Sequence, residues 1–167
     1  LALIGVIATH LAVNLLDDYF DFQYDEKNIR EKLSEQGLMA RRGKCAYLVE
    51  GRVTLKELRF RIAILTFIAI AIGIFITFAR GWQIILIGCI TAFLGFFYTA
   101  QPLKLASRGG KEIITGLIFG PLLLGGVYFS ACGSFSSTLW ITAIIMGIAV
   151  FNIAYVHAFI DQTTDKI

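Results

Sequence analysis

Long apolar stretches with little or no charge constrain this chain more than any other feature. Each approaches the ~20 residues that a helix needs to cross the hydrocarbon core of a bilayer. Unpaired backbone polar groups are costly in lipid, so these stretches are expected to be helices. Core helices of a large soluble protein are the alternative, but so many such runs in a chain that is 57% hydrophobic argue against it. Five spans are predicted, over residues 1–16, 62–79, 82–100, 113–131 and 139–160.

The predicted fold class is therefore all-α, a polytopic transmembrane helical bundle. A single domain is expected over residues 1–167, with residues 26–58 forming a cytoplasmic loop within it. Both ends are expected to be cut, because Leu1 already begins an apolar run and Ile167 directly follows a charged cluster. No basic segment precedes the first run, which argues against a signal peptide. Whether the loop closes over a site stays open.

Charge is distributed very unevenly across the predicted spans. If the five spans alternate in direction, 14 of the 15 Lys and Arg residues lie on one side, and Arg80 is the exception. Basic residues concentrate on the cytoplasmic side of membrane proteins, which predicts an integral membrane protein with this side in the cytoplasm. All 12 acidic residues share that side. Trp82 and Trp140 are expected at the opposite interface.

Composition excludes several other functions. The net charge of +3 is too small to indicate a nucleic-acid partner, and no pattern indicates a protein partner, so membrane lipid is the expected surrounding. Cys45, Cys89 and Cys132 have no metal-ligand spacing and are interpreted as unpaired thiols. His10, the one ionisable group well inside a span, is interpreted as a helix-packing residue rather than a proton relay.

The first of two aspartate clusters follows the first span and reads NLLDDYFDFQYD. If the helix continues, five side chains fall within a stripe about 100° wide at about 100° per residue: Asn14, Asp17, Asp18, Asp21 and Asp25. Carboxylates one turn apart repel each other, more so at the mouth of a low-dielectric bundle. Such a stripe is reasonable where a cation binds, although a solvated acidic helix end is the alternative.

The second cluster, HAFIDQTTD, puts Asp161 and Asp165 one helical turn apart at the charged end of the last span. Carboxylates from two helices at one depth suit Mg²⁺, which is often held by one or two carboxylates together with substrate phosphates. A phosphorylated or diphosphorylated substrate is therefore predicted. Lys104 and Arg108, in the turn after Tyr98, are candidates to bind its remaining charge, with membrane anchoring as the alternative. For Lys111, anchoring is the preferred interpretation.

The two motifs together resemble those of the UbiA superfamily of intramembrane prenyltransferases. DDYFDFQYD, from Asp17 to Asp25, resembles the first family motif, with Asp17 in place of the usual Asn, and DQTTD, from Asp161 to Asp165, resembles the second. The segment YTAQPLKLASRGGKEIITGLIFGPLLLGGVYF is similar to the family's middle region. In detail the chain looks most like the branch that prenylates 1,4-dihydroxy-2-naphthoate for menaquinone. The family has about nine spans.

The resemblance implies transfer of an isoprenoid from an allylic prenyl diphosphate to an aromatic acceptor. It implies Mg²⁺ held by Asp18, Asp21, Asp25, Asp161 and Asp165, with catalysis by Asp18, Asp21, Asp161 and Asp165. Substrate binding is expected from Asn14, Asp17, Tyr98, Lys104 and Arg108. Phe96, Phe97, Tyr98 and Phe119 are considered as borders of an allylic cation, against ordinary packing. Acceptors left open are 4-hydroxybenzoate, homogentisate, a porphyrin and a glycerol phosphate ether; a divalent-cation transporter or a membrane scaffold is the alternative class.

Overall fold

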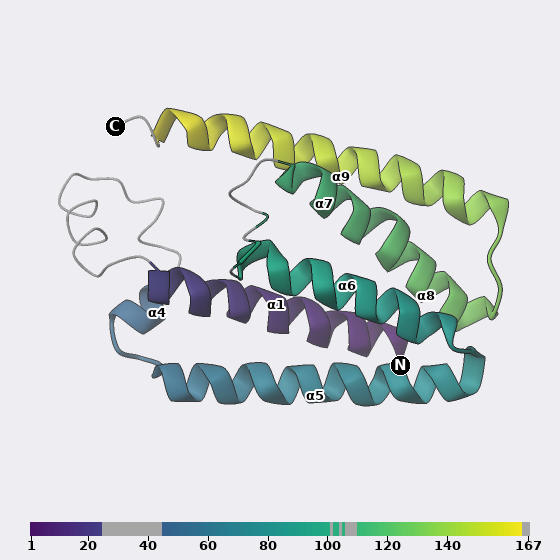
Figure 1. Ribbon diagram of the computed structural model, residues 1–167, viewed down its shortest axis with the longest axis horizontal. Helices are drawn as coiled ribbons and strands as arrows, with labels where there is room; N and C mark the ends of the chain where they lie inside the picture. The colour runs from purple at the N-terminus through teal and green to yellow at the C-terminus, as the bar shows by residue number, and fades with distance from the viewer. Residues whose placement is uncertain (25–44, 101, 104, 106–109, 165–167) are drawn as a thin grey trace.

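The described part of the chain is entirely helical in its regular structure. The computed structural model describes residues 1–24, 45–100, 102, 103, 105 and 110–164, with backbone alone at 24, 49, 99 and 157–164. Its elements are α1 (Ala2–Tyr24), α4 (Ala46–Val49), α5 (Leu55–Arg80), α6 (Gln83–Thr99), α7 (Lys111–Leu117), the π-helical turn η2 (Ile118–Leu122), α8 (Leu123–Cys132) and α9 (Ser137–Thr164). The elements α7, η2 and α8 follow one another without a break and act as one long helix (Figure 1).

The long helices alternate in direction along the bundle, as the sequence predicts. The last residues of α1, α6 and α9 lie at one end with α4 and the first residues of α5 and α7 (Figure 1). This is the charged end of the bundle. Arg80 lies at the opposite end, where its Nε donates a 3.0 Å hydrogen bond to the carbonyl of Ser130. Trp82 and Trp140 belong to the helix starts at that opposite end.

Four segments of the described chain are long and apolar enough to span a membrane. They are Ala2–Gln23, Leu55–Arg80, Lys111–Cys132 and Ser137–Val156. The predicted span over residues 82–100 is shorter, because α6 has 17 residues. At 1.5 Å per residue it is ~25 Å long, at the lower limit for crossing a core of ~30 Å. The all-α membrane bundle is confirmed, with one of its five apolar helices at minimal length.

The start of α5 is set by a capping box. The hydroxyl of Thr54 accepts a 3.2 Å hydrogen bond from the backbone N–H of Glu57, whose carboxylate accepts one of 2.8 Å from the backbone N–H of Thr54. Two helix-end donors are thereby satisfied. The helix therefore begins at Leu55, so residues 55–58 of the expected loop over 26–58 are helical.

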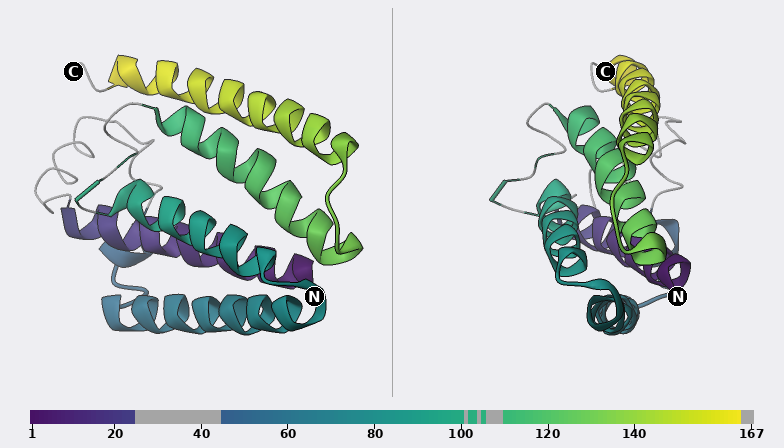
Figure 2. Two further views of the ribbon diagram at one scale, coloured as in Figure 1. Left: turned by 45° about the vertical axis from the view of Figure 1, so that its right-hand side comes forward. Right: turned by 90° about the vertical axis from the view of Figure 1, so that its right-hand side faces the viewer.

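The bundle consists of two packed groups. Helix α1 lies against α5 along its length and also contacts α6 (Figure 2). Helix α9 packs on the long helix formed by α7, η2 and α8. That long helix leans across toward α1 and α6 near its α8 end, which joins the two groups.

The α9 contact is a direct approach of two backbones at glycines. A Cβ added at Gly120 would lie 2.5 Å from the carbonyl oxygen of Ala143 and 2.7 Å from the Cα of Gly147. A Cβ at Gly116 would lie 2.8 Å from the carbonyl oxygen of Gly147. Small residues four apart permit this approach, which in lipid supplies the van der Waals contact that holds helices together. No larger residue fits without moving the helices.

Gly120→Ala is therefore expected to destabilise the protein. Overpacking of this kind costs about 1–3 kcal/mol, so the thermal unfolding midpoint of the whole protein in detergent should fall by several degrees. Gly88→Ala is the matched control, because a Cβ there meets nothing within 4 Å and alanine favours a helix. Equal midpoints for the two variants would contradict the backbone contact.

Candidate functional site

The first motif lies on α1, as the sequence predicts. The helix continues unbroken to Tyr24, so Asp17, Asp18 and Asp21 are helical residues in its last two turns. Asp25 lies outside the described residues. The stripe that these carboxylates form therefore ends at the charged end of the bundle.

The direction in which most of this stripe faces can be read from His10, one turn before Asn14. Nε2 of His10 and Nδ2 of Asn14 form a hydrogen-bonded pair at 3.3 Å. The His10 ring meets the ring of Phe119 on η2 edge to face, with centroids 5.8 Å apart. Residues 10, 14, 17 and 21 share one side of a helix, so Asn14, Asp17 and Asp21 continue along the side that faces η2.

The second motif lies on α9. This helix runs to Thr164, so the backbone of Asp161 is helical. The structure does not describe the side chain of Asp161 or any part of Asp165. Both motif helices reach the charged end, where the start of α7 and the end of α6 lie between them (Figure 2). The helices that carry the two motifs thus form opposite walls at one end of the bundle.

The connection between α6 and α7 enters at the same end. Tyr98 is half-buried in the last turn of α6 and Lys111 begins α7. Lys104 and Arg108 lie outside the described residues, so their expected binding of phosphate stays a prediction.

The aromatic residues considered as borders of a cation differ in their surroundings. Phe96 packs edge to face on Phe20 of α1, with ring centroids 6.0 Å apart, and on Phe97 at 5.2 Å. Phe97 also meets Phe93 at 4.8 Å. These contacts form an ordinary aromatic cluster between α6 and α1. Phe119 differs, because it lies against His10 on the side of α1 that carries Asn14 and Asp17.

Asp18 lies at the edge of the aspartate stripe and is bound by the segment that precedes α5. The hydroxyl of Tyr47 on α4 donates a 2.7 Å hydrogen bond to Oδ2 of Asp18. The thiol of Cys45 lies 3.5 Å from Oδ1 of Asp18 and 3.5 Å from its main-chain oxygen. Sequence reasoning missed both residues: Cys45 was interpreted as an unpaired thiol, and no pattern in the sequence marks Tyr47.

A small hydrophobic core holds these donors in place. Cys45, Leu48 and Leu58 are 2%, 6% and 1% exposed and pack together. Surrounding them are seven partly buried residues from α1, α4, α5 and the turn between α4 and α5: Leu15, Tyr19, Phe22, Tyr47, Val53, Leu55 and Ile62. Cys45 has a left-handed backbone with φ 63° and is the N-cap residue of α4. The contact with Asp18 is therefore made by a packed element.

The environment keeps Tyr47 in its neutral, donating form. Burial raises the pKa of its hydroxyl above the ordinary value of 10, and the hydrogen bond and negative charge of Asp18 raise it further. Both causes disfavour a second negative charge beside the carboxylate.

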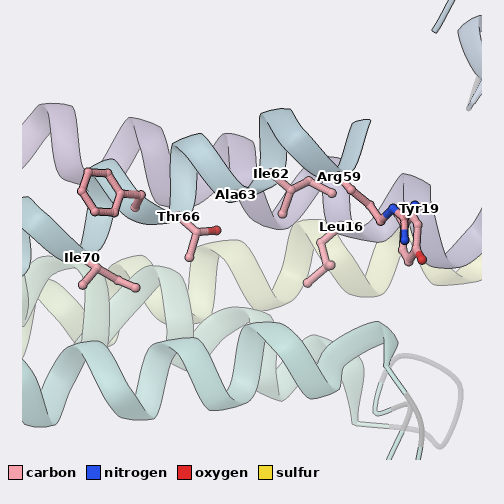
Figure 3. Close-up of a pocket in the computed structure, with 8 residues that line it drawn as sticks. Leu16, Tyr19, Arg59, Ile62, Ala63, Thr66 and Ile70 are labelled. Carbon is pink, nitrogen blue, oxygen red and sulfur yellow. The ribbon is translucent and has the colours of Figure 1, made fainter. Parts of the chain in front are cut away.

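A groove along the described helices lies away from these carboxylates. It has a volume of about 510 Å³, and its lining is almost entirely apolar, with Tyr19 and Arg59 at the charged end (Figure 3). The lining residues are Leu16, Tyr19, Arg59, Ile62, Ala63, Thr66, Phe67 and Ile70. Leu16 and Tyr19 lie roughly 100° or more around α1 from Asn14, Asp17 and Asp21. The groove is therefore separate from the motif side of α1.

The donor chemistry at the charged end fits a hard divalent cation in part. Carboxylate oxygens are the ligands that Mg²⁺ prefers, and Asp17, Asp18 and Asp21 supply them on one helix end. Within the described side chains, no three His, Cys, Asp or Glu residues are gathered closely enough to hold a metal. A complete ligand set would require the second motif and Asp25.

Leu58→Ala is expected to loosen α4 and expose Cys45. Removing a buried leucine costs at least about 2 kcal/mol. If this loss lowers the free energy needed to open α4 locally, Cys45 should react with a maleimide roughly 30-fold faster. The rate is measured in the whole protein with Cys89 and Cys132 replaced by Ala. Phe60→Ala is the control, because Phe60 is on the same helix and 66% exposed. An unchanged rate in Leu58→Ala would contradict the role of this core.

Comparison with known proteins tests the resemblance to the UbiA superfamily. The chain is 26% identical over 159 residues to the 2-carboxy-1,4-naphthoquinone phytyltransferase of Synechocystis, covering 94% of this chain and 47% of that protein. It is 25% identical over 115 residues to the 1,4-dihydroxy-2-naphthoate octaprenyltransferase of Bacillus subtilis, covering 68% of this chain and 33% of that protein. The chain thus spans half or less of these relatives. No solved structure matches it significantly. The model of the UbiA prenyltransferase family matches residues 1–167, and the chain belongs to that family.

Proposed function

We propose that the protein carrying this chain is a Mg²⁺-dependent intramembrane prenyltransferase. It moves an isoprenoid from an allylic prenyl diphosphate to an aromatic acceptor. The observation that carries the proposal is that the two aspartate motif helices, α1 and α9, reach the same end of a helical membrane bundle. Family membership supports the same reaction class.

The proposed roles of the residues follow from the two aspartate motifs and from the side of α1 on which Asn14, Asp17 and Asp21 lie. Asp18, Asp21 and Asp25 from the first motif and Asp161 and Asp165 from the second would hold the metal ions. Bound there, Mg²⁺ would supply charge stabilisation for the departing diphosphate. Lys104 and Arg108 would bind the phosphate oxygens left over, while Asn14 and Asp17 face the same side of α1 as Asp21. The prenyl chain would lie among the apolar helices, away from water.

The proposed reaction is a substitution at C1 of the prenyl group. The C1–O bond breaks and the diphosphate leaves with the electron pair. A ring carbon of the acceptor donates an electron pair to C1, and then releases its proton, or its carboxylate as CO₂, to restore aromaticity. Phe119, which lies against His10 on the motif side of α1, and Tyr98, in the last turn of α6, are the aromatic side chains that would face positive charge developing on the prenyl group.

For the acceptor we propose 1,4-dihydroxy-2-naphthoate, in menaquinone biosynthesis. Both relatives named above act on naphthalene-derived rings according to their names. 4-Hydroxybenzoate and homogentisate are the alternative acceptors included in the test.

The experiment is a product assay with the full-length protein in membranes. Prenyl diphosphate and Mg²⁺ are supplied with 1,4-dihydroxy-2-naphthoate, 4-hydroxybenzoate or homogentisate, and products are identified by mass. A prenylated naphthalenoid is the expected product. A product from another ring alone would reject the acceptor, and absence of product from every ring would reject the enzyme.

Asp21→Ala and Asp161→Ala are each expected to lower product formation by about 10²-fold or more, because each removes a group that stabilises the transferring charge. Glu50→Ala is the matched control. Glu50 is an acidic residue at the same end whose half-exposed side chain pairs with Arg52 at 2.7 Å. Activity retained in either aspartate variant would contradict its assigned role.

The charged end is proposed to face the cytoplasm of a bacterial cell, since basic residues concentrate there. In an otherwise cysteine-free protein, Cys132 at the opposite end should react with a membrane-impermeant maleimide in intact cells, because it is exposed. A cysteine placed at Glu50 should react only after the cells are permeabilised. The reverse pattern would overturn the orientation.

A further inference from the structure

The carboxylate of Asp18 is bound by the chain that precedes α5. What we infer from this contact about the metal site rests on the proposed function. The two oxygens of the Asp18 carboxylate approach different donors, the hydroxyl of Tyr47 at 2.7 Å and the thiol of Cys45 at 3.5 Å. Both donors come from one short element, and both lie at least 27 residues along the chain from Asp18. A tertiary contact therefore sets the direction of this carboxylate.

The element that supplies these donors is rigidly packed. Cys45, Leu48 and Leu58 form its core, each less than 10% exposed. The backbone N–H of Val53 donates to the carbonyl of Tyr47 at 3.1 Å, which closes the turn after α4. Because α4 is packed against both α1 and α5, the Tyr47 hydroxyl has little freedom to follow a moving carboxylate.

The carboxylate of Asp18 has lone pairs beyond the one that accepts from Tyr47, and these suit it to bind a cation. An ionised carboxylate has about four lone-pair sites on its two oxygens, and the hydroxyl of Tyr47 occupies one of them. Groups that hydrogen-bond a metal-binding carboxylate from outside fix its orientation and commonly change metal affinity 10- to 100-fold when removed. The bond also offsets part of the repulsion that Asp18 meets from Asp17 and Asp21 on the same helix end.

We propose that Tyr47 is a positioning residue that holds the Asp18 carboxylate in the orientation that binds the cation of the prenyl diphosphate complex. Tyr47 itself touches neither cation nor substrate in this role. Cys45 supports the same orientation through the second oxygen. The rival interpretation is that Asp18 only anchors α4 and takes no part in cation binding.

Tyr47→Phe separates these interpretations, since it removes the hydroxyl and keeps the ring that packs beside Leu58. Tyr19→Phe is the matched control. Tyr19 belongs to the same hydrophobic cluster, but its hydroxyl accepts a 2.9 Å hydrogen bond from Gln23 and none of its described contacts is with Asp18. Both variants are made in the full-length protein, together with Asp18→Asn and Cys45→Ala.

The first readout is cation binding without turnover. Mn²⁺ is titrated as a probe for Mg²⁺ in the presence of prenyl diphosphate and without acceptor, and free Mn²⁺ is followed by electron paramagnetic resonance. Tyr47→Phe should weaken Mn²⁺ binding about 10-fold, Asp18→Asn at least as much, and Cys45→Ala less. Tyr19→Phe should bind as the wild type does. The Mg²⁺ concentration for half-maximal activity should shift in parallel, with the KM for the acceptor unchanged.

The outcomes separate the two proposals. A lower unfolding midpoint in Tyr47→Phe with unchanged Mn²⁺ binding would overturn the positioning role and leave the prenyltransferase standing. Mn²⁺ binding that is weaker in Tyr47→Phe than in the wild type would support the positioning role. If the wild-type protein at the same time prenylates no acceptor, the proposed enzyme is overturned. A wild-type protein that binds no Mn²⁺ with prenyl diphosphate present would overturn both.

Discussion

The contact between the backbones of α7–η2 and α9 is the constraint on which the arrangement of the site depends. In lipid, apolar side chains gain little by leaving one apolar surrounding for another, so helices associate through close packing. Gly116 and Gly120 allow α9 to approach until only a glycine, Gly147, fits opposite them. Helix α9 packs chiefly on α7, η2 and α8 in the described chain, so this contact determines where the second motif lies.

The π-helical turn η2 connects that contact to the first motif. Pro121 has no backbone N–H and its ring would collide with the carbonyl of Leu117 in a regular α-helix. A wider turn accommodates the ring, and the helix continues as α8. Within the same five residues, Gly120 meets α9 and Phe119 meets His10 on α1. One turn of unusual geometry thus contacts both motif helices, which explains why an apolar span carries a proline at its middle.

The sequence predicts the fold well because hydropathy and charge act over whole helices. The apolar runs, their alternation and the continuation of α1 through Asp21 all follow from local periodicity. The bond from Tyr47 to Asp18 does not follow, because it depends on how α4 folds back over the end of α1. The bounds of α6, Gln83–Thr99, agree with the predicted span over 82–100 to within one residue at each end. Asp25, Lys104, Arg108 and Asp165 lie outside the described residues and stay predictions.

The two walls of the proposed site are therefore held by different physical means. The α9 wall is positioned by backbone packing in the apolar part of the bundle, and the α1 wall by a hydrophobic core and a hydrogen-bonded carboxylate at the charged end. Like charges on the two walls would repel if they approached each other without a cation. On the proposed function, a diphosphate with its metal ions would reverse that repulsion, and by mass action its binding would stabilise the folded protein.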